Sequence, residues 1–356
     1  MNRLRSLVYI AVLMLIIGWV LHIGRAIFIP IVLGAAIVYV IVGLTHAQQR
    51  IPILGQAMPI QLRYLLAVLF IGLIVGALVY LVLANKERVL ALTPKYQESL
   101  LAAIQSVAVT LGIESEPTWA TLRQDLLNLV NVRSLVGSMV SSVSSMILSI
   151  VVVLLYATFL LFETRSYPGK LDHLSDTPQG SARIRQVAQD INARIGSYLA
   201  LKSVLSVLLG AVCWALMRWV GLEFAGFWAV LITLLNFIPY IGSFLGVLFP
   251  LAMAIAQFQD PAVIFYLAMG LIVVQFLIGS FLDPYVMGNS LNLSPFAILV
   301  SLAVWSEFWG IAGAFLAVPI TAVIVIIFSE FASTRPVAVL LSRTGQVRAT
   351  GDRHAA

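Results

Sequence analysis

Two long apolar runs in the C-terminal half contain helix breakers at their centres, and this combination restricts the possible folds more than any other feature. Residues 224–259 carry no charged side chain, and residues 284–328 carry only Glu307. Each run is far longer than the ~20 residues a helix needs to cross the hydrocarbon core. Within the runs lie Asn236, Pro239, Gly242 and Pro250, then Pro295, Gly310, Gly313 and Pro319. Because a broken helix leaves backbone groups unpaired, it is tolerated only in a protein interior or beside a water-filled cavity. The runs therefore indicate a transport protein with its pathway in the C-terminal half.

The composition predicts an all-α polytopic membrane protein. Hydrophobic residues make up 61% of the chain, charged residues only 10%, and the mean hydropathy is +1.03. A soluble domain carries about 25% charged residues. The net charge of +6 comes from Lys and Arg spread over predicted loops, as the positive-inside rule requires. The lipid bilayer is therefore the predicted partner, and nucleic acid is not.

Apolar and amphipathic segments divide the chain into six parts. We predict transmembrane helices 1–3 in 1–84, extracytoplasmic amphipathic helices in 85–134, a fourth transmembrane helix in 135–162, a basic cytoplasmic amphipathic helix in 163–200, a transmembrane core with broken helices in 201–330 and a cytoplasmic tail in 331–356. The amphipathic pair either packs together or on the bilayer, or else forms a vestibule or subunit contact.

Topology follows from the basic residues and the number of crossings. Arg3 and Arg5 place the N-terminus in the cytoplasm. If both broken runs cross fully, the chain has about eight transmembrane helices. If both are re-entrant hairpins, it has six. Either count returns the C-terminus to the cytoplasm, so both alternatives stay open.

The chain lacks the common signatures of enzymes and cofactor sites. It contains no G-x-x-x-x-G-K-[ST], H-E-x-x-H or G-x-S-x-G motif, and its four histidines are scattered. We therefore predict no catalytic residue, no metal site and no cofactor. Transport is expected to depend on an ion gradient or on the gradient of the solute itself.

The first candidate site is the break in the first run. Pro239 lacks a backbone donor and frees the carbonyl group one turn earlier. Gly242, two residues beyond Tyr240, permits a sharp change of direction. Asn236 supplies a donor and an acceptor at that point. The group can bind a polar solute or ion, or it can be a kink whose freed groups bond to neighbouring helices.

Two further clusters lie later in the chain. Asp283, followed by Pro284 and Gly288, is either a wet residue at the membrane boundary or a coupling carboxylate in a cavity. Glu307 stands between Trp305 and Trp309, so it either tops a hairpin at the interface or is a buried carboxylate that binds protons. Gly310, Gly313 and Pro319 complete the predicted pathway residues.

Four motifs in this order resemble the autoinducer-2 exporter family of bacterial membrane proteins. They are Asn236-Phe237-Ile238-Pro239-Tyr240-Ile241-Gly242, Pro284-x-x-x-Gly288, Leu291-x-Leu293-Ser294-Pro295 and Trp309-Gly310-x-x-Gly313-x-x-x-Ala317-Val318-Pro319. The likeness covers nearly the whole chain. Two positions depart from the family pattern, because Asn289 stands where a basic residue is frequent and Glu307 where small or apolar residues are usual.

The resemblance implies an α-helical transporter of the bacterial inner membrane. Members of the family are linked to export of autoinducer-2, a small, polar, uncharged quorum-sensing signal. Others resemble sodium–proton antiporters. The family is also associated with ring-like homo-oligomers, pentamers among them.

Three functions remain open from the sequence. The first is export of a small polar solute, with autoinducer-2 as the best candidate. The second is cation–proton exchange, for which Asp283 and Glu307 are the first candidate carboxylates and Glu163 and Glu223, at span ends, the next. The third is a membrane scaffold, which does not account for two broken helices.

Overall fold

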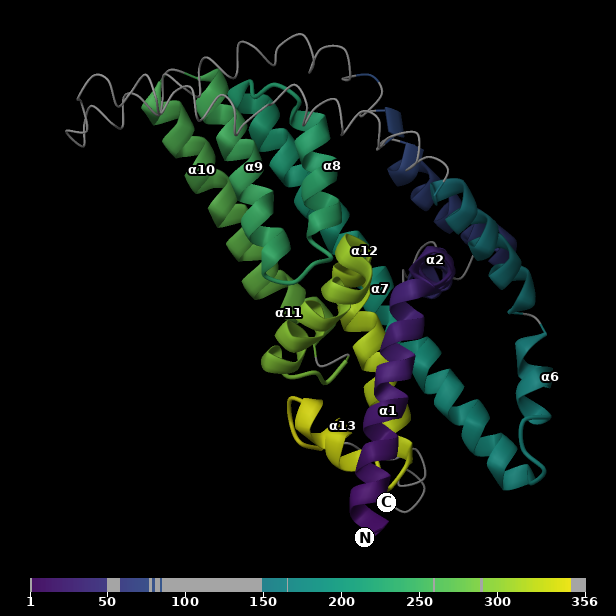
Figure 1. Ribbon diagram of the computed structural model, residues 1–356. Coiled ribbons are helices and arrows are strands. Elements are labelled where there is room, and N and C mark those ends of the chain that lie inside the picture. Colours follow the sequence, from purple (N-terminus) through teal and green to yellow (C-terminus); the bar gives the residue numbers. More distant parts are fainter. Residues whose placement is uncertain are drawn as a thin grey trace. The chain divides into compact units, whose positions relative to one another are not determined.

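The computed structural model describes residues 2–49, 58–76, 79–80, 84, 149–164, 166–258, 260–288 and 291–346, and its secondary structure is helical. The only β-type pairing in these ranges is an isolated bridge between Leu293 and Ser342. The elements (Figure 1) are α1 (Asn2–Ile23), α2 (Arg25–Gln49), α6 (Tyr167–Asp172), α7 (Pro178–Val220), α8 (Ala225–Leu235), α9 (Ile241–Gln257), α10 (Pro261–Phe276), the π-helix η1 (Leu277–Leu282), α11 (Asp283–Met287), α12 (Pro295–Glu330) and α13 (Arg335–Leu341). Two further apolar helices cover Ile60–Gly76 and Ser149–Glu163.

The chain folds into two compact units built from interleaved segments. Unit 1 comprises Met1–Leu69, Ser149–Val204 and Tyr285–Ala356, and unit 2 comprises Phe70–Leu148 and Leu205–Pro284. Each unit has its own apolar core. The core of unit 1 joins residues of α2, α7, α12 and α13, and the core of unit 2 joins residues of α7, α8, α9 and α10.

The first broken run forms a helical hairpin, α8–α9, within unit 2. The two helices pack against each other, and the side chain of Gln257 at the end of α9 reaches back to the start of α8. Its Oε1 accepts from the backbone N–H of Glu223 at 2.7 Å, and its Nε2 donates to the carbonyl of Gly221 at 2.8 Å. With 11 residues, α8 is only about 16 Å long, well short of a ~30 Å hydrocarbon core.

The second broken run also doubles back, within α12. Gly310 interrupts the helix with φ 60° and ψ −137°, a conformation essentially confined to glycine. The indole Nε1 of Trp305 donates to Oγ1 of Thr321 at 3.2 Å. In a straight helix these residues would be about 24 Å apart, at 1.5 Å per residue. Residues 295–309 and 311–330 are therefore the two arms of a second hairpin, and the label α12 covers both.

The helix α7 is longer than the sequence led us to expect. We predicted a cytoplasmic helix in 163–200 and a separate span after it. The structure has one continuous helix of 43 residues, about 64 Å long, which passes through position 200 without a break. No proline follows Pro178 within this helix, so nothing in the backbone forces it to end at the polar-to-apolar boundary.

The long helix between the two hairpins changes its winding near its end. After α10 the chain forms the six-residue π-helix η1 and continues directly into α11. Pro284 stands at the second position of α11 and has no N–H to donate to the preceding turn. A wider turn before Pro284 makes room for its ring, and such π segments are frequent at functional sites.

These observations confirm the predicted helical architecture and agree with a membrane protein. Among the described residues, four helices are long and apolar enough to cross a bilayer: Arg25–Thr45, Pro178–Val220, Pro261–Met287 and Pro295–Glu330. Gly310 folds the last of these into two arms, so it is not one straight crossing. The predicted amphipathic helices in 85–134 and the first half of the span predicted in 135–162 lie outside the described residues.

A glycine contact allows α2 and α7 to approach closely in unit 1. A Cβ atom on Gly43 would lie 2.3 Å from the carbonyl oxygen of Gly196 and 2.8 Å from Cβ of Ala200. Small residues at such crossings let helix backbones come together, which drives helix association in membranes.

Gly43→Ala is expected to destabilise unit 1, because the added methyl group collides with a backbone oxygen that cannot move alone. We expect a loss of about 1–3 kcal/mol, typical of overpacking. Thermal unfolding of the purified protein in detergent measures it. Gly76→Ala is the control, because a Cβ there meets nothing within 4 Å. Equal unfolding midpoints for the two variants would contradict the close crossing.

Candidate functional site

The backbone reverses sharply at the tip of the first hairpin, around Pro239 and Tyr240. Tyr240 has φ 60° and ψ −57°, and the N–H of Ile241 donates to the carbonyl of Pro239 at 2.7 Å. This is a γ-turn of the rare, strained type. Backbone strain of this kind persists only where the surrounding structure enforces it, and it is concentrated at functional sites. The predicted break is thus a complete reversal rather than a kink.

The carbonyl group that Pro239 frees is satisfied within the tip. The oxygen of Leu235 accepts from the N–H of Ile238 at 2.8 Å, and the N–H of Gly242 donates to Ile238 at 2.9 Å. A Cβ on Gly242 would lie 1.8 Å from the Leu235 oxygen. Glycine is therefore required at position 242 by the close approach of the two arms.

Three neutral polar side chains are buried at or near this tip. Asn236 is 7% exposed, and its Nδ2 donates to Oγ of Ser206 on α7 at 3.0 Å. Gln275 of α10 is 8% exposed and lies against α9, because a Cβ on Gly246 would be 2.7 Å from its Nε2. Gly246 is one turn beyond Gly242. Among the described residues of unit 2, these three are the only buried polar side chains, and none carries a charge.

The tip of the second hairpin is held by two tryptophan side chains within unit 1. Trp309 is buried, and its Nε1 donates to the carbonyl of Leu21 in α1 at 3.0 Å. Trp305 bonds to Thr321 in the opposite arm. A Cβ on Gly313 would lie 1.8 Å from the carbonyl oxygen of Trp305, so the arms again meet at a glycine. Pro319, further along the returning arm, is buried.

The remaining predicted residues lie elsewhere. Asp283 and Pro284 begin α11, and Gly288 ends it with φ 53°. Asp283 is half-buried, whereas Glu307 is exposed one turn before the second tip. The two candidate carboxylates therefore occupy different elements, and Glu307 on this chain is a surface residue.

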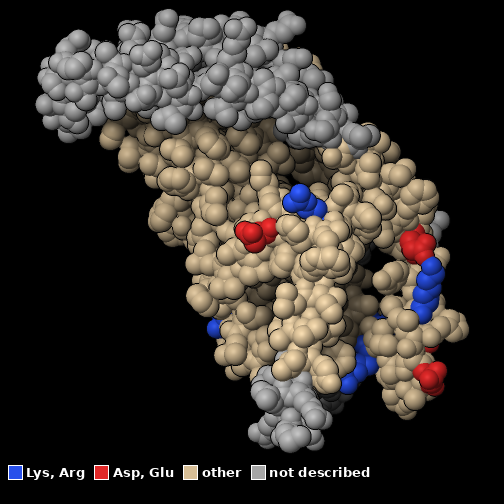
Figure 2. Space-filling view, in the orientation of Figure 1, with Lys and Arg blue, Asp and Glu red and all other residues tan. Residues whose placement is uncertain are grey.

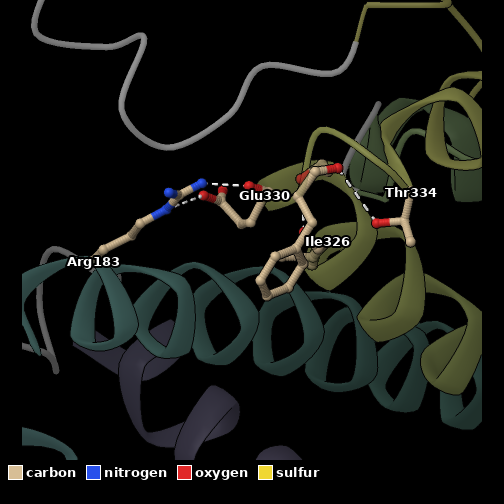
Figure 3. A network of polar contacts seen from close by, with 6 residues as sticks. Arg183, Ile326, Glu330 and Thr334 are labelled. Carbon is tan, nitrogen blue, oxygen red and sulfur yellow. Dashed lines mark hydrogen bonds and ion pairs between the residues drawn. The ribbon is translucent and has the colours of Figure 1, made fainter. Parts of the chain in front are cut away.

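Two charged residues are buried in the described part of the chain, Lys202 and Glu330, each 8% exposed. Neither was predicted from the sequence. Figure 3 shows Arg183 reaching from α7 to Glu330 at the end of α12. Its Nε lies 3.2 Å from Oε2 of Glu330, and its Nη2 donates to the backbone carbonyl of the same residue. A negative residue at a helix C-terminus is unfavourable, and the arginine offsets both its charge and the helix dipole.

Neighbouring hydroxyl groups complete the end of α12. Thr334 Oγ1 donates to the carbonyl of Phe328 at 3.0 Å, and Ser329 Oγ donates to that of Ile326 at 2.6 Å (Figure 3). These bonds satisfy carbonyl groups that a helix end leaves without a partner in the helix. The position of Glu330 just after the apolar run marks it as a residue of interest. Its buried ion pair was not predictable, because the partner Arg183 is 147 residues away along the chain.

Charges are sparse on the outer surface as well. On the face drawn in Figure 2, Lys, Arg, Asp and Glu occupy a few separate patches, and the rest of the described surface is uncharged. Large apolar side chains such as Tyr9, Leu15 and Phe265 are exposed. Such a surface is suited to contact with lipid tails.

Comparing the stability of Tyr240→Gly with that of Tyr240→Ala separates the effect of backbone strain from the effect of losing the aromatic ring. Both variants remove the aromatic side chain, but only glycine adopts φ 60° and ψ −57° without strain. The glycine variant should therefore be more stable by about 1–2 kcal/mol. Thermal unfolding in detergent gives the comparison, and an alanine variant as stable as the glycine variant would contradict a strained γ-turn.

Arg183→Ala should destabilise the end of α12, because it leaves the buried Glu330 carboxylate without its arginine. We expect about 1–2 kcal/mol rather than the ~3–5 kcal/mol of a fully buried pair. The discount applies because the Arg183 side chain is 56% exposed. Thermal unfolding in detergent again measures the effect.

Lys170→Ala is the matched control for Arg183→Ala. The pair of Lys170 with Glu163 is exposed on both sides, with side-chain exposures of 64% and 46%. Its loss should change stability by no more than about 1 kcal/mol. If Lys170→Ala costs as much as Arg183→Ala, burial of Glu330 is not the source of the effect.

Comparison with known proteins places nearly the whole chain in one family. The model of the AI-2E family transporter matches residues 9–333. The AI-2 transport protein TqsA of Escherichia coli (strain K12) is 26% identical over 348 residues, which cover 96% of each chain. YhhT of the same organism is 28% identical over 272 residues, 76% of this chain and 75% of its own. A sodium-lithium/proton antiporter of Halobacillus andaensis is 25% identical over 210 residues, 59% of this chain and 57% of its own.

The family match covers both helical hairpins, the helix that joins them and the buried end of α12. It confirms the resemblance that the four motifs predicted. This chain is a multi-pass membrane protein that belongs to the AI-2E family of transporters.

Proposed function

We propose that the protein exports a small, uncharged polar solute across the bacterial inner membrane, with autoinducer-2 as the best candidate. The observation that carries the proposal is the set of neutral polar groups at the first hairpin. Asn236, Ser206 and Gln275 are the buried polar side chains in the described part of unit 2, and they offer amide and hydroxyl groups. A neutral solute needs hydrogen-bond donors and acceptors rather than a counter-charge.

The sequence relationship supports the same solute. TqsA carries the name of an AI-2 transport protein and aligns with almost the whole chain. Autoinducer-2 is small, polar and uncharged, which fits the neutral side chains at the tip. Because the chain contains no phosphate-binding loop, we assign the driving force to a gradient, either of the solute or of an ion.

Cation–proton exchange is the second candidate, and one relative favours it. The antiporter of Halobacillus andaensis aligns with 59% of this chain. Exchange requires a carboxylate that binds a proton and a cation in turn. The buried carboxylate of Glu330 bonds to Arg183, which a cation would have to displace. Glu307 is exposed, and Asp283 is half-buried. These carboxylates therefore suit cation–proton exchange less well than the buried neutral side chains suit export of a neutral solute.

Uptake of autoinducer-2 by everted inner-membrane vesicles tests the proposal. Vesicles that contain the protein should accumulate the signal above empty-vector vesicles. Pro239→Ala and Asn236→Ala should reduce uptake while the protein still inserts. The first alters the chain reversal, and the second removes the side-chain amide beside it. Normal uptake in both variants would show that the tip of the first hairpin takes no part in transport.

A pair of serine variants provides the matched control. Ser206→Ala removes the partner of Asn236, whereas Ser203→Ala, one turn away on α7, removes a hydroxyl that bonds within its own helix to Leu199. Only the first should reduce uptake. If the unsubstituted protein does not accumulate autoinducer-2 but dissipates a pH gradient when Na⁺ or Li⁺ is added, cation exchange replaces solute export.

A further inference from the structure

The short helix α13 connects the two ends of α12 within unit 1. At its start, the N–H of Arg335 donates to the carbonyl of Phe331, the residue after α12, at 2.9 Å. At its end, the carbonyl of Leu341 accepts from the N–H of Ser294, the residue that caps the start of α12, at 2.9 Å. With seven residues, α13 is about 10 Å long, which matches the ~8–10 Å spacing of two packed helices. Figure 1 shows α13, in yellow, beside the end of α12 rather than in line with it.

Further contacts fix α13 and the segment after it. The side chain of Ala338, in the middle of α13, is fully buried in the core of unit 1. The N–H of Arg343 donates to the carbonyl of Asn292 at 3.0 Å, and Nδ2 of Asn292 donates to the carbonyl of Gln346 at 3.2 Å. Because one face of α13 is held against the protein in this way, the opposite face points outward.

The two ends of α12 coincide with the edge of the apolar sequence. The helix begins at Pro295 and ends at Glu330, which is the first charged residue after Glu307. This segment is long and apolar enough for a bilayer, and its two arms return the chain toward its starting level. A helix tied to both ends of such a segment is expected at the level of the lipid headgroups.

The outward face of α13 is apolar. Val337, Val339 and Leu340 are exposed, and Leu340 has an exposed fraction of 80%. Phe331, just before α13, is 58% exposed. Side chains of this kind lose free energy when they face water. An amphipathic helix avoids that loss when its apolar face enters the boundary between headgroups and acyl chains by about 5–10 Å.

Arginine is the main charged residue beside this face. Arg335 and Arg343 stand at the two ends of α13, and both are exposed. From residue 331 to residue 356 the sequence contains four arginines and a single acidic residue, Asp352. A guanidinium group presents several N–H donors in a fixed fork that matches the oxygens of a phosphate group. Basic residues next to a membrane segment also attract anionic lipids.

We propose that α13 is an interfacial helix that binds anionic phospholipids. Its apolar face lies in the headgroup boundary, and Arg335 and Arg343 contact lipid phosphates that carry no neighbouring cation. This contact attaches the base of the second hairpin to one leaflet. It depends on the charge of the lipid and not on a transported solute, so it is independent of the proposed export of autoinducer-2.

A fluorescent dye at position 340 tests the proposal in the full-length protein. Leu340→Cys is combined with Cys213→Ala, since Cys213 is the single cysteine of the chain and is buried. The labelled protein is reconstituted into vesicles of phosphatidylglycerol and phosphatidylcholine in equal amounts. One of the two lipids carries a nitroxide quencher on its upper acyl chain. Iodide in the aqueous phase is the third quencher.

The dye should be quenched by the lipid nitroxides rather than by iodide, and more strongly by labelled phosphatidylglycerol than by labelled phosphatidylcholine. One basic residue at an anionic surface is worth a preference of about fivefold. Arg335→Gln and Arg343→Gln should therefore each lower the enrichment of phosphatidylglycerol about fivefold. Arg185→Gln is the matched control, because it removes the same charge from an exposed arginine near the start of α7 that pairs with Asp172.

Four results would overturn the proposal. Quenching by iodide alone would mean that the outward face of α13 lies in water. Protection from all three quenchers would mean that protein covers this face. Equal quenching by the two labelled lipids, with every arginine present, would mean that the helix enters the interface without selecting anionic lipids. An equal loss of preference in Arg185→Gln would assign the selectivity to net charge and not to α13.

Discussion

The requirement that every backbone N–H and C=O be hydrogen-bonded inside hydrocarbon controls the architecture of this protein. The chain reverses twice within apolar sequence. At the first reversal the bonds Ile238 to Leu235, Ile241 to Pro239 and Gly242 to Ile238 use groups that the broken helix would leave unpaired. The strain at Tyr240 is a consequence, because the γ-turn pairs the N–H of Ile241 with the carbonyl of Pro239. Where the chain leaves the apolar region, at Glu330, side chains of Arg183 and Thr334 take over the same task.

Close contact between helix backbones is the second feature that determines how this protein packs. Glycines at 43, 242 and 313 stand where a Cβ would collide with a carbonyl oxygen. In a membrane the lipid tails are as apolar as leucine, so helices gain little from burial alone and depend on tight packing. Those positions explain why a chain rich in leucine, valine and isoleucine can still specify definite helix pairs.

The sequence predicted the features that depend on local chemistry. Pro239, Gly242 and Gly310 marked the places where the helices end, because proline and glycine act through their own backbone, and the structure reverses at those places. The direction of the chain after each break was not predictable, since it depends on contacts such as Trp305 with Thr321. Continuity of α7 was missed because a change from polar to apolar residues alters the environment of a helix without ending it. Glu330 was missed because its arginine partner is distant in the sequence.

The short first arm of the α8–α9 hairpin has a consequence for biosynthesis. At 11 residues, α8 cannot be released into lipid by the insertion machinery as an independent span, since it covers only about half of the hydrocarbon thickness. Its lateral exit must wait until α9 has been synthesised as far as Gln257, whose side chain closes the hairpin on Gly221 and the N–H of Glu223. We therefore expect the hairpin to enter the bilayer as one unit, after α7, which precedes it along the chain.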